Sequence, residues 1–202
     1  MVSHSAPSAF SRSTLAEEAA RRALAGAAPG PVLSRLRART VQELLMLNSH
    51  TGCELCPTLQ ALCTALGQCV RRRPGWLYTI FPTGNLCPVA AHPVLVQAAV
   101  LQALRPVLAS GGQAVLQVRP LSGSTLLCLR GGAPASVPPL WQALVRQGGT
   151  AVFGSGMQFS AAAQLFPAAD CKIQRSPSAL ELLEDRFSLP YLFLSDYCAV
   201  PW

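Results

Sequence analysis

Residues 92–110 read HPVLVQAAVLQALRPVLAS, and the rest of the fold is organised around this stretch. The apolar residues have helical spacing and cover more than half of the helix surface, so we expect a helix that lies deep in the core. Pro106 departs from this pattern. Proline cannot donate to the carbonyl of Gln102 and its ring crowds that turn, at a cost of about 3 kcal/mol. The helix is therefore expected to kink at Pro106 or to end near Arg105.

A hairpin and two glycine turns are predicted after this helix. Residues 114–121 and 124–129 are rich in strand-forming residues and flank Ser122-Gly123, which predicts a β-hairpin. The pair Gly131-Gly132 closes the second strand, and a short helix is expected over 140–146. The turn Gly154-Ser155-Gly156 is expected to lead into a helix over 159–166. Elements in this order could form a cradle for a nucleotide.

The N-terminal part of the chain predicts a helical hairpin. Helices are expected over 15–24 and 32–47, joined by a Gly/Pro-rich turn. Both are amphipathic, so their apolar stripe must be buried in a bundle, against the domain or against a second copy of the chain. We therefore expect a mobile N-terminus over 1–12, a dimerisation-like hairpin over 13–50 and one domain over 53–202.

The remaining elements indicate the fold class. Further strands are predicted over 76–81, 171–174 and 187–194, and further helices over 57–73 and 179–185. Together these elements predict an α/β fold of the α+β sandwich type. Its mixed, mostly antiparallel sheet is expected to be covered on one face by helices and preceded by the helical hairpin.

Composition excludes several classes of protein. The chain has 202 residues, of which 50% are hydrophobic and 12% charged, so it is expected to be globular rather than disordered. No apolar run approaches the ~18 residues that cross a bilayer, and the N-terminus lacks the pattern of a secretory signal. We therefore expect no membrane span and a cytoplasmic location. The net charge of +7 is scattered along the chain, so no nucleic-acid partner is expected.

The eight cysteines of the chain raise the question of a metal or redox site. Cys56 and Cys63 are seven residues apart on the apolar face of the helix expected over 57–73, which favours core packing over zinc binding. Cys53 and Cys56 have the spacing of a redox pair, but no strand is predicted before them. A metal or redox role for His50, Cys53, Cys56 and Cys63 remains the weaker alternative.

At about residues 53–195 the order of elements resembles the ATP-binding domain of sensor histidine kinases, a fold shared with DNA gyrase and MutL. His92-Pro93 is similar to the Asp-Pro pair that opens the family's asparagine-bearing helix. The strand over 124–129, running into 130–134, resembles the strand that carries the adenine-binding Asp. Residues 154–159 are similar to the glycine loop that surrounds the phosphates, and the hairpin resembles the end of the kinases' dimerisation helices.

The resemblance implies ATP and magnesium as ligands, and it also indicates a degenerate site. The positions that match nucleotide-binding residues are Gln102, Gly131, Gly132, Gly154, Ser155 and Gly156. The family's magnesium-binding asparagine is matched by Pro106, whose side chain has no donor or acceptor. The adenine-reading Asp is matched by Arg130, which has the wrong charge, and the third glycine of the phosphate loop by Gln158. ATP and magnesium are therefore expected to bind weakly or not at all.

Two functions follow from the resemblance. The first is a cytoplasmic signalling module without catalytic residues, which acts by binding a protein partner or a second copy, as a homodimer, through the hairpin. The second is an active ATP-dependent histidine kinase with divergent contacts, in which Gln102 replaces an asparagine. The second function needs a phosphoacceptor. His4, His50 and His92 each fit an ordinary surface or capping histidine better.

Overall fold

The structure is a computed structural model that describes residues 11–26, 30–47, 50–69, 76–131, 138–148, 160–184, 188 and 191–194. The helices are α1 (Arg12–Leu24), α2 (Gly30–Leu45), α3 (Leu55–Cys69), α4 (Pro93–Ser110), α5 (Pro139–Gly148), α6 (Ala179–Glu184) and α7 (Tyr191–Leu194). The strands are β1 (Thr51–Glu54), β2 (Leu77–Ile80), β3 (Pro88–Val89), β4 (Ala114–Leu121), β5 (Ser124–Gly131), β6 (Ser160–Leu165) and β7 (Lys172–Ile173).

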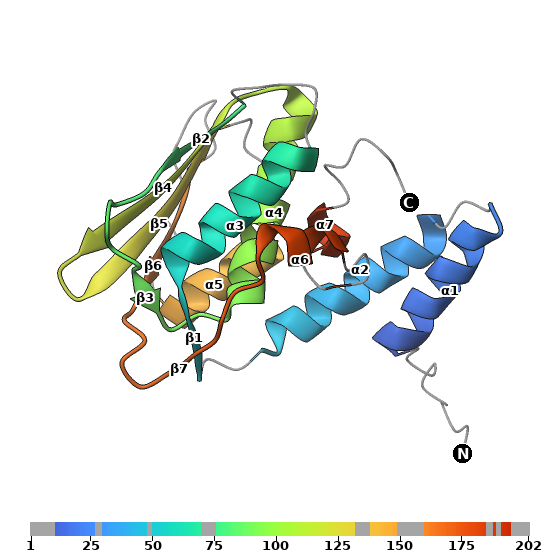
Figure 1. Cartoon of the computed structure of the whole chain (residues 1–202), viewed down its shortest axis with the longest axis horizontal. Coiled ribbons are helices and arrows are strands. Elements are labelled where there is room, and N and C mark those ends of the chain that lie inside the picture. The colour runs from blue at the N-terminus through green and yellow to red at the C-terminus, as the bar shows by residue number, and fades with distance from the viewer. Residues whose placement is uncertain are drawn as a thin grey trace, which may run out of the picture.

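The main sheet has the strand order β2-β4-β5-β6, in which β2 is parallel to β4 and the other neighbours are antiparallel. A small sheet, β3-β1-β7, lies beside it. Helices α3, α4 and α5 cover one face of the main sheet, and the hairpin of α1 and α2 lies beyond these helices (Figure 1). The predicted α+β class, with a mixed, mostly antiparallel sheet and a preceding helical hairpin, is confirmed.

Helix α4 is continuous, which excludes the predicted end near Arg105. It runs through Pro106 to Ser110. Leu104 and Val107 on either side of the proline are fully buried, and burial of each such side chain is worth about 1.5–3 kcal/mol, enough to offset the lost backbone hydrogen bond. The helix ends at Ser110, where Gly111 takes a left-handed φ of 71° and the Gly112 N–H donates to the carbonyl of Val107 at 3.1 Å.

The helix predicted over 159–166 is wrong, since residues 160–165 form strand β6. Ala161, Ala163 and Leu165 are buried in alternation and face the helices, while β6 pairs with β5 from Arg130 to Thr125. Alanine favours helices, but this preference is small and is overridden when a side-chain period of two matches a buried sheet face. The short sequence FSAAAQLF is compatible with the period of a helix and with the period of a strand.

Two more predictions at the ends of the domain need correction. No strand is predicted between the helices expected over 32–47 and 57–73, whereas residues 51–54 form β1, the central strand of the small sheet. Gly52 suits that position because a Cβ there would lie 2.7 Å from Cβ of Ala168 and 2.8 Å from the carbonyl oxygen of Val89. The strand predicted over 187–194 is also wrong, because 191–194 form helix α7, whose Leu192, Phe193 and Leu194 are buried.

Helix α6 begins with a capping box that makes its stability depend on pH. The Ser178 N–H donates to Oε2 of Glu181 at 2.7 Å, and the Glu181 N–H donates to Oγ of Ser178 at 3.3 Å. Arg175 also donates to this carboxylate, at 3.1 Å. The bond from Arg175, followed by those from Ser178, lowers the pKa of Glu181 from 4.5 to about 2. Stability from the ionised carboxylate is therefore present above pH 4.5 and is lost as the pH falls towards 2.

We expect Glu181→Gln to lower the thermal unfolding midpoint at pH 7, because glutamine accepts weaker hydrogen bonds and cannot pair with Arg175. The difference from the wild type should shrink as the pH falls from 4.5 towards the folded pKa of about 2. Midpoints measured across this pH range test the expectation. Glu184→Gln is the control, since Glu184 forms no ion pair with the described residues. A difference that stays constant down to pH 2 would contradict the assignment.

Candidate functional site

Gln102 lies at the contact between α4 and α5, where its side chain caps the second helix. The backbone N–H of Leu140 donates to Oε1 of Gln102 at 3.0 Å. Leu140 is in the first turn of α5, where backbone N–H groups have no partner within the helix. The same N–H groups would be the natural donors to a phosphate at this helix end. The amide oxygen of Gln102 thus occupies a donor that an anionic ligand could use.

Pro106 and Arg130 offer no group that would hold magnesium or read adenine. Pro106 is half-buried in α4, one turn beyond Gln102, and its side chain has neither a donor nor an acceptor. Arg130 is exposed on β5 opposite Val115, and its guanidinium carries donors only. Magnesium requires oxygen ligands, and the exocyclic amine of adenine requires an acceptor. The side chains at these two positions therefore supply neither the magnesium ligand nor the adenine acceptor that the resemblance leads one to expect there.

Gly131, a predicted nucleotide-binding residue, has a role in the sheet itself. It pairs with Ala114 at the end of β5 and has a φ of 139°, which side chains rarely permit. A Cβ at this position would lie 2.2 Å from the carbonyl oxygen of Gln113. The close approach of β4 is thus sufficient to require glycine at position 131.

Four of the predicted nucleotide-binding residues, Gly132, Gly154, Ser155 and Gly156, lie outside the described residues, so their roles remain predictions. The described elements nevertheless weaken the match between residues 154–156 and the family's phosphate loop. The segment 154–156 leads into strand β6 rather than into a helix. The helix that follows β5 and packs against α4 is α5, and it is joined to β5 by the seven residues 132–138. The phosphate loop of the family leads into a helix. In this chain the segment that follows β5 and leads into a helix is 132–138.

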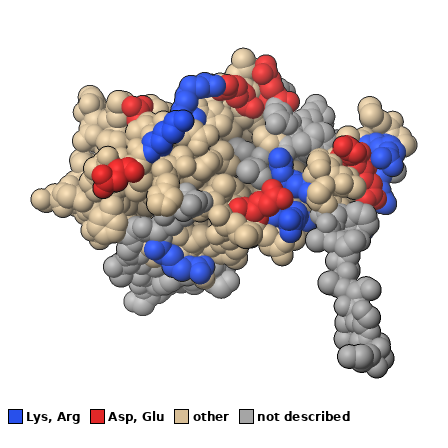
Figure 2. Space-filling view, turned by 90° about the horizontal axis from the view of Figure 1, so that it is seen from below, with Lys and Arg blue, Asp and Glu red and all other residues tan. Residues whose placement is uncertain are grey.

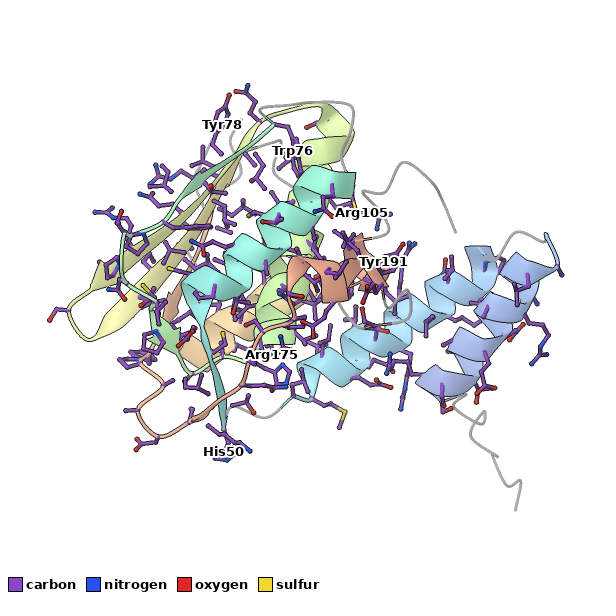
Figure 3. The ribbon with its side chains drawn as sticks, viewed as in Figure 1. His50, Trp76, Tyr78, Arg105, Arg175 and Tyr191 are labelled. Atoms are coloured by element: carbon purple, nitrogen blue, oxygen red, sulfur yellow. The ribbon has the colours of Figure 1, made fainter. Side chains whose placement is uncertain are left out.

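The described histidines do not meet at the candidate site. His92 precedes α4, where its Nδ1 accepts from the N–H of Val94 at 3.3 Å and its carbonyl accepts from Val96, so the predicted capping role is confirmed. Burial lowers the pKa of His92, which keeps the ring neutral and able to accept. His50 is exposed at the start of the small sheet, well apart from Arg105 of α4 (Figure 3). His4 lies outside the described residues.

Comparison with known proteins gives structural neighbours only. The sequence matches none of the family models and none of the curated proteins with which it was compared. The structure is similar to that of a histidine kinase from Burkholderia phymatum STM815, with a TM-score of 0.44 and 12% identity over 76% of this chain and 84% of that one. It is also similar to the Acinetobacter baumannii histidine kinase AdeS, with a TM-score of 0.43 and 13% identity over 77% of this chain and 95% of that one.

The structure does not bring the predicted metal and redox residues together as a site. No group of three or more His, Cys, Asp or Glu side chains in the described part of the chain could hold a metal ion. A strand, β1, does precede Cys56, contrary to prediction, but burial raises the pKa of Cys53 to about 11 and of Cys63 to about 12. Burial, with the neighbouring Cys87, also raises the pKa of Cys56 to about 12. Protonated thiols are poor nucleophiles and metal ligands, so core packing remains the better account.

The apolar stripe of the hairpin is buried within the chain. Val32, Leu33 and Leu36 of α2 pack with α1 and with Leu192 in a small cluster of their own, while Leu44 joins the main core. On the face drawn in Figure 2, basic side chains lie beside acidic ones rather than forming one positive surface. None of the described helices is both long and apolar enough to cross a lipid bilayer.

Sequence reasoning missed a hollow between the hairpin and the domain. It has a volume of about 140 Å³ and is lined by residues of α2, α4 and α7, including Arg37, Gln102, Arg105 and Phe193. Arg37 and Arg105 looked like ordinary charged residues on two separate helices. Only the tertiary arrangement of α2, α4 and α7 brings them to one place, so no pattern along the chain could have predicted it.

Proposed function

We propose that this chain is a signalling or regulatory module with a histidine kinase-like ATPase fold, whose nucleotide site is degenerate and which acts by protein contact. The observation that carries the proposal is the hydrogen bond between the Leu140 N–H and Oε1 of Gln102. A phosphate at this helix end would have to displace the amide and then replace its hydrogen bond. The protein side chain thus competes with the ligand.

The chemistry of the neighbouring positions supports the same conclusion. Pro106 stands where the family's magnesium ligand would be, and Arg130 where the adenine acceptor would be. Gly131 is accounted for by the close approach of Gln113, so its presence does not argue for a ligand. Each binding function therefore lacks its chemical group, while the hydrophobic core around α4 is intact.

The protein-contact part of the proposal concerns the outer side of the hairpin. Because the apolar stripe of α2 is buried, the surface that remains for a protein partner or for a second copy is the exposed side of this helix, which includes Ser34, Arg35 and Gln42. Together with the exposed Ala38 and Leu45 of the same helix, these side chains give the mixed composition of an ordinary protein surface, as in non-obligate contacts between proteins. A transient partner therefore fits it better than a permanent one.

The expected result of titrating the chain with a non-hydrolysable ATP analogue and magnesium is no binding tighter than the millimolar range, about −4 kcal/mol. Calorimetry of the whole chain, with and without magnesium, is the measurement. Binding in the micromolar range that depends on magnesium would refute the proposal. It would favour the alternative, an active histidine kinase in which Gln102 contributes to nucleotide binding.

Incubation with γ-labelled ATP is the decisive control for that alternative. A kinase of this type must form a phosphohistidine, so label should enter the chain or an added response regulator and should be lost in His50→Gln. We expect no label in either protein. Acid-labile label on the wild type that is absent from His50→Gln would establish the alternative, an active histidine kinase.

A further inference from the structure

A second hollow lies beside the small sheet, between the start of α3 and the segment that joins β7 to α6 (Figure 1). This small-sheet hollow has a volume of about 480 Å³ and is lined by Glu54, Pro57, Ala61 and residues 173–178. Ile173 and the two residues after it are exposed, so the hollow opens to solvent. Its volume is within the roughly 300–1,000 Å³ of ordinary ligand pockets, so a long side chain can enter it.

The charges around the small-sheet hollow leave one carboxylate without a partner. The side chain of Glu54 forms no hydrogen bond or ion pair with the described residues. Arg175, on the segment that follows β7 (Figure 3), also lines the hollow, but two of its nitrogens donate to the carboxylate of Glu181. Lys172 is not among the lining residues. One negative charge, that of Glu54, is therefore left for a ligand.

The hydroxyl groups in the wall of the hollow leave an acceptor for a ligand. The hydroxyl of Thr58 donates to the carbonyl of Glu54 at 2.7 Å and also forms a hydrogen bond with the hydroxyl of Ser176. Because each hydroxyl has one proton, Ser176 is the donor in the second bond, and its oxygen keeps a free lone pair. The rest of the wall is apolar and consists of Pro57, Ala61, Ile173 and Pro177. A cationic donor on an aliphatic stem suits this combination.

The free edge of β7 borders the same hollow. The N–H groups of Lys172 and Gln174 donate to carbonyls on the β1 side, at 3.3 Å and 2.8 Å. In a parallel pair the intervening residues direct their N–H and C=O groups away from the partner strand, which applies here to Ile173 and Arg175. No other strand of the described chain pairs with this edge. An extended peptide can therefore add to it as a further strand.

We propose that the small-sheet hollow binds an arginine side chain carried by an extended segment of a partner protein. The planar guanidinium forms two parallel hydrogen bonds with the free carboxylate of Glu54, and the methylene stem lies on the apolar wall. The outward backbone groups of Ile173 and Arg175 pair with the peptide beside this arginine. A metal ion fits less well, because Glu54 is the only acidic residue among those that line the hollow.

The inference goes beyond the proposed function in two respects. It places a partner site on the small sheet, on different elements from the hairpin and from the positions that match nucleotide-binding residues. It also specifies the chemistry of the partner, an arginine in an extended segment. The site does not depend on whether a nucleotide binds to the chain.

The test is a calorimetric titration of the full chain, at constant ionic strength, with the blocked pentapeptide acetyl-Thr-Val-Arg-Val-Thr-amide. We expect saturable binding of one peptide per chain. The same peptide with citrulline in place of arginine should bind about tenfold more weakly or worse, because citrulline keeps the shape of the side chain but not its charge. This comparison leaves the protein unchanged, so it does not depend on the folding of a variant.

Glu54→Gln is the corresponding change in the protein. It keeps the size of the side chain and removes its charge, so it should weaken binding of the arginine peptide about tenfold or more. In this variant the arginine and citrulline peptides should differ by less than about twofold, since the pair that distinguishes them is lost. Glu184→Gln is the matched control. It removes the same charge from an exposed position on α6 that does not line the hollow, and it should change affinity less than about twofold.

Several outcomes would overturn the inference. These are absence of saturable binding, equal affinities for the arginine and citrulline peptides, and an equal loss of affinity in Glu54→Gln and Glu184→Gln. Acetyl-arginine-amide, which cannot add as a strand, should bind at least about tenfold more weakly than the pentapeptide, and equal affinity would overturn the role of the β7 edge. Tight magnesium-dependent ATP binding overturns the proposed function alone, since peptide binding is measured in its own titration.

Discussion

Replacing Gly131 by alanine is expected to lower the free energy of unfolding by about 3 kcal/mol or more, through backbone strain and overpacking. The residue has a φ of 139°, and an added Cβ would lie 2.2 Å from the carbonyl oxygen of Gln113 and 2.9 Å from Cα of Ala114. These neighbours are backbone atoms at the start of β4, so they cannot rotate away. Urea denaturation of the wild type and the variant, fitted with a common m-value, is the measurement.

Two other glycines provide matched controls for this substitution. Gly123 has a φ of 72° but nothing within 4 Å of an added Cβ, so Gly123→Ala should cost only the left-handed strain of about 1–2 kcal/mol. Gly67 lies inside α3 with open space beside it, and Gly67→Ala should stabilise by about 0.5–1 kcal/mol. If Gly131→Ala cost no more than Gly123→Ala, the β4–β5 pairing would be able to shift, and glycine at 131 would need another explanation.

The result bears on the candidate site because glycine at the end of β5 can have two origins. A nucleotide cradle needs glycine for close approach of a ligand, whereas here close approach of the next strand is sufficient. Sequence cannot distinguish these origins, since both leave the same residue after a strand. The distance from Gln113 shows that the second origin is sufficient, so glycine at this position is no evidence for a ligand.

The sequence predicted those elements in which the period of the apolar residues and the residues at the element's ends indicate the same structure. Helix α4 and the β4–β5 hairpin combine long apolar patterns with glycine at their ends, and both were predicted within a few residues. The prediction for β6 failed because its six residues fit both a helix and a strand. Only the pairing with β5 decides between the two. Strand β1 was not predicted, because four residues between two helices are too few to show an alternation of apolar and polar residues.

The residues of the candidate site were named from the sequence and their role in binding stays a prediction, whereas their contacts could not be predicted. Gln102 was named through the resemblance to the kinase family, yet its partner Leu140 is 38 residues away and contributes a backbone N–H that no side-chain pattern reveals. The hollow is lined by residues of α2, α4 and α7, and the arrangement of such distant elements is set by the whole core. Chemistry carried by single residues could therefore be predicted, whereas contacts between elements could not.

Leu36→Ala is expected to destabilise the hairpin by about 2–5 kcal/mol, the usual cost of removing a buried leucine and leaving a cavity. Leu36 is fully buried in the small cluster that joins α1, α2 and Leu192 and is separate from the main core. Because of this separation, amide exchange should become faster in α1 and the first half of α2, with much less change in α4. Exchange rates measured for both regions test the expectation.

Leu24→Ala is the matched control, since Leu24 ends α1 in the same hairpin but is 90% exposed. It should change stability by less than about 0.5 kcal/mol. Equal effects of the two substitutions, or an equal rise of exchange in α4, would show that the cluster is not a separate unit.

Leu36→Ala also tests how the hairpin contacts a partner. An apolar stripe that is buried inside one chain cannot at the same time form the seam of a dimer, unless the hairpin first detaches from Leu192. If a wild-type dimer formed through this stripe, its unfolding midpoint would rise with protein concentration, and Leu36→Ala would dissociate it. We expect a midpoint that does not depend on concentration, with Leu36→Ala acting inside the chain. Any association would then use the exposed side of α2 and would survive the substitution.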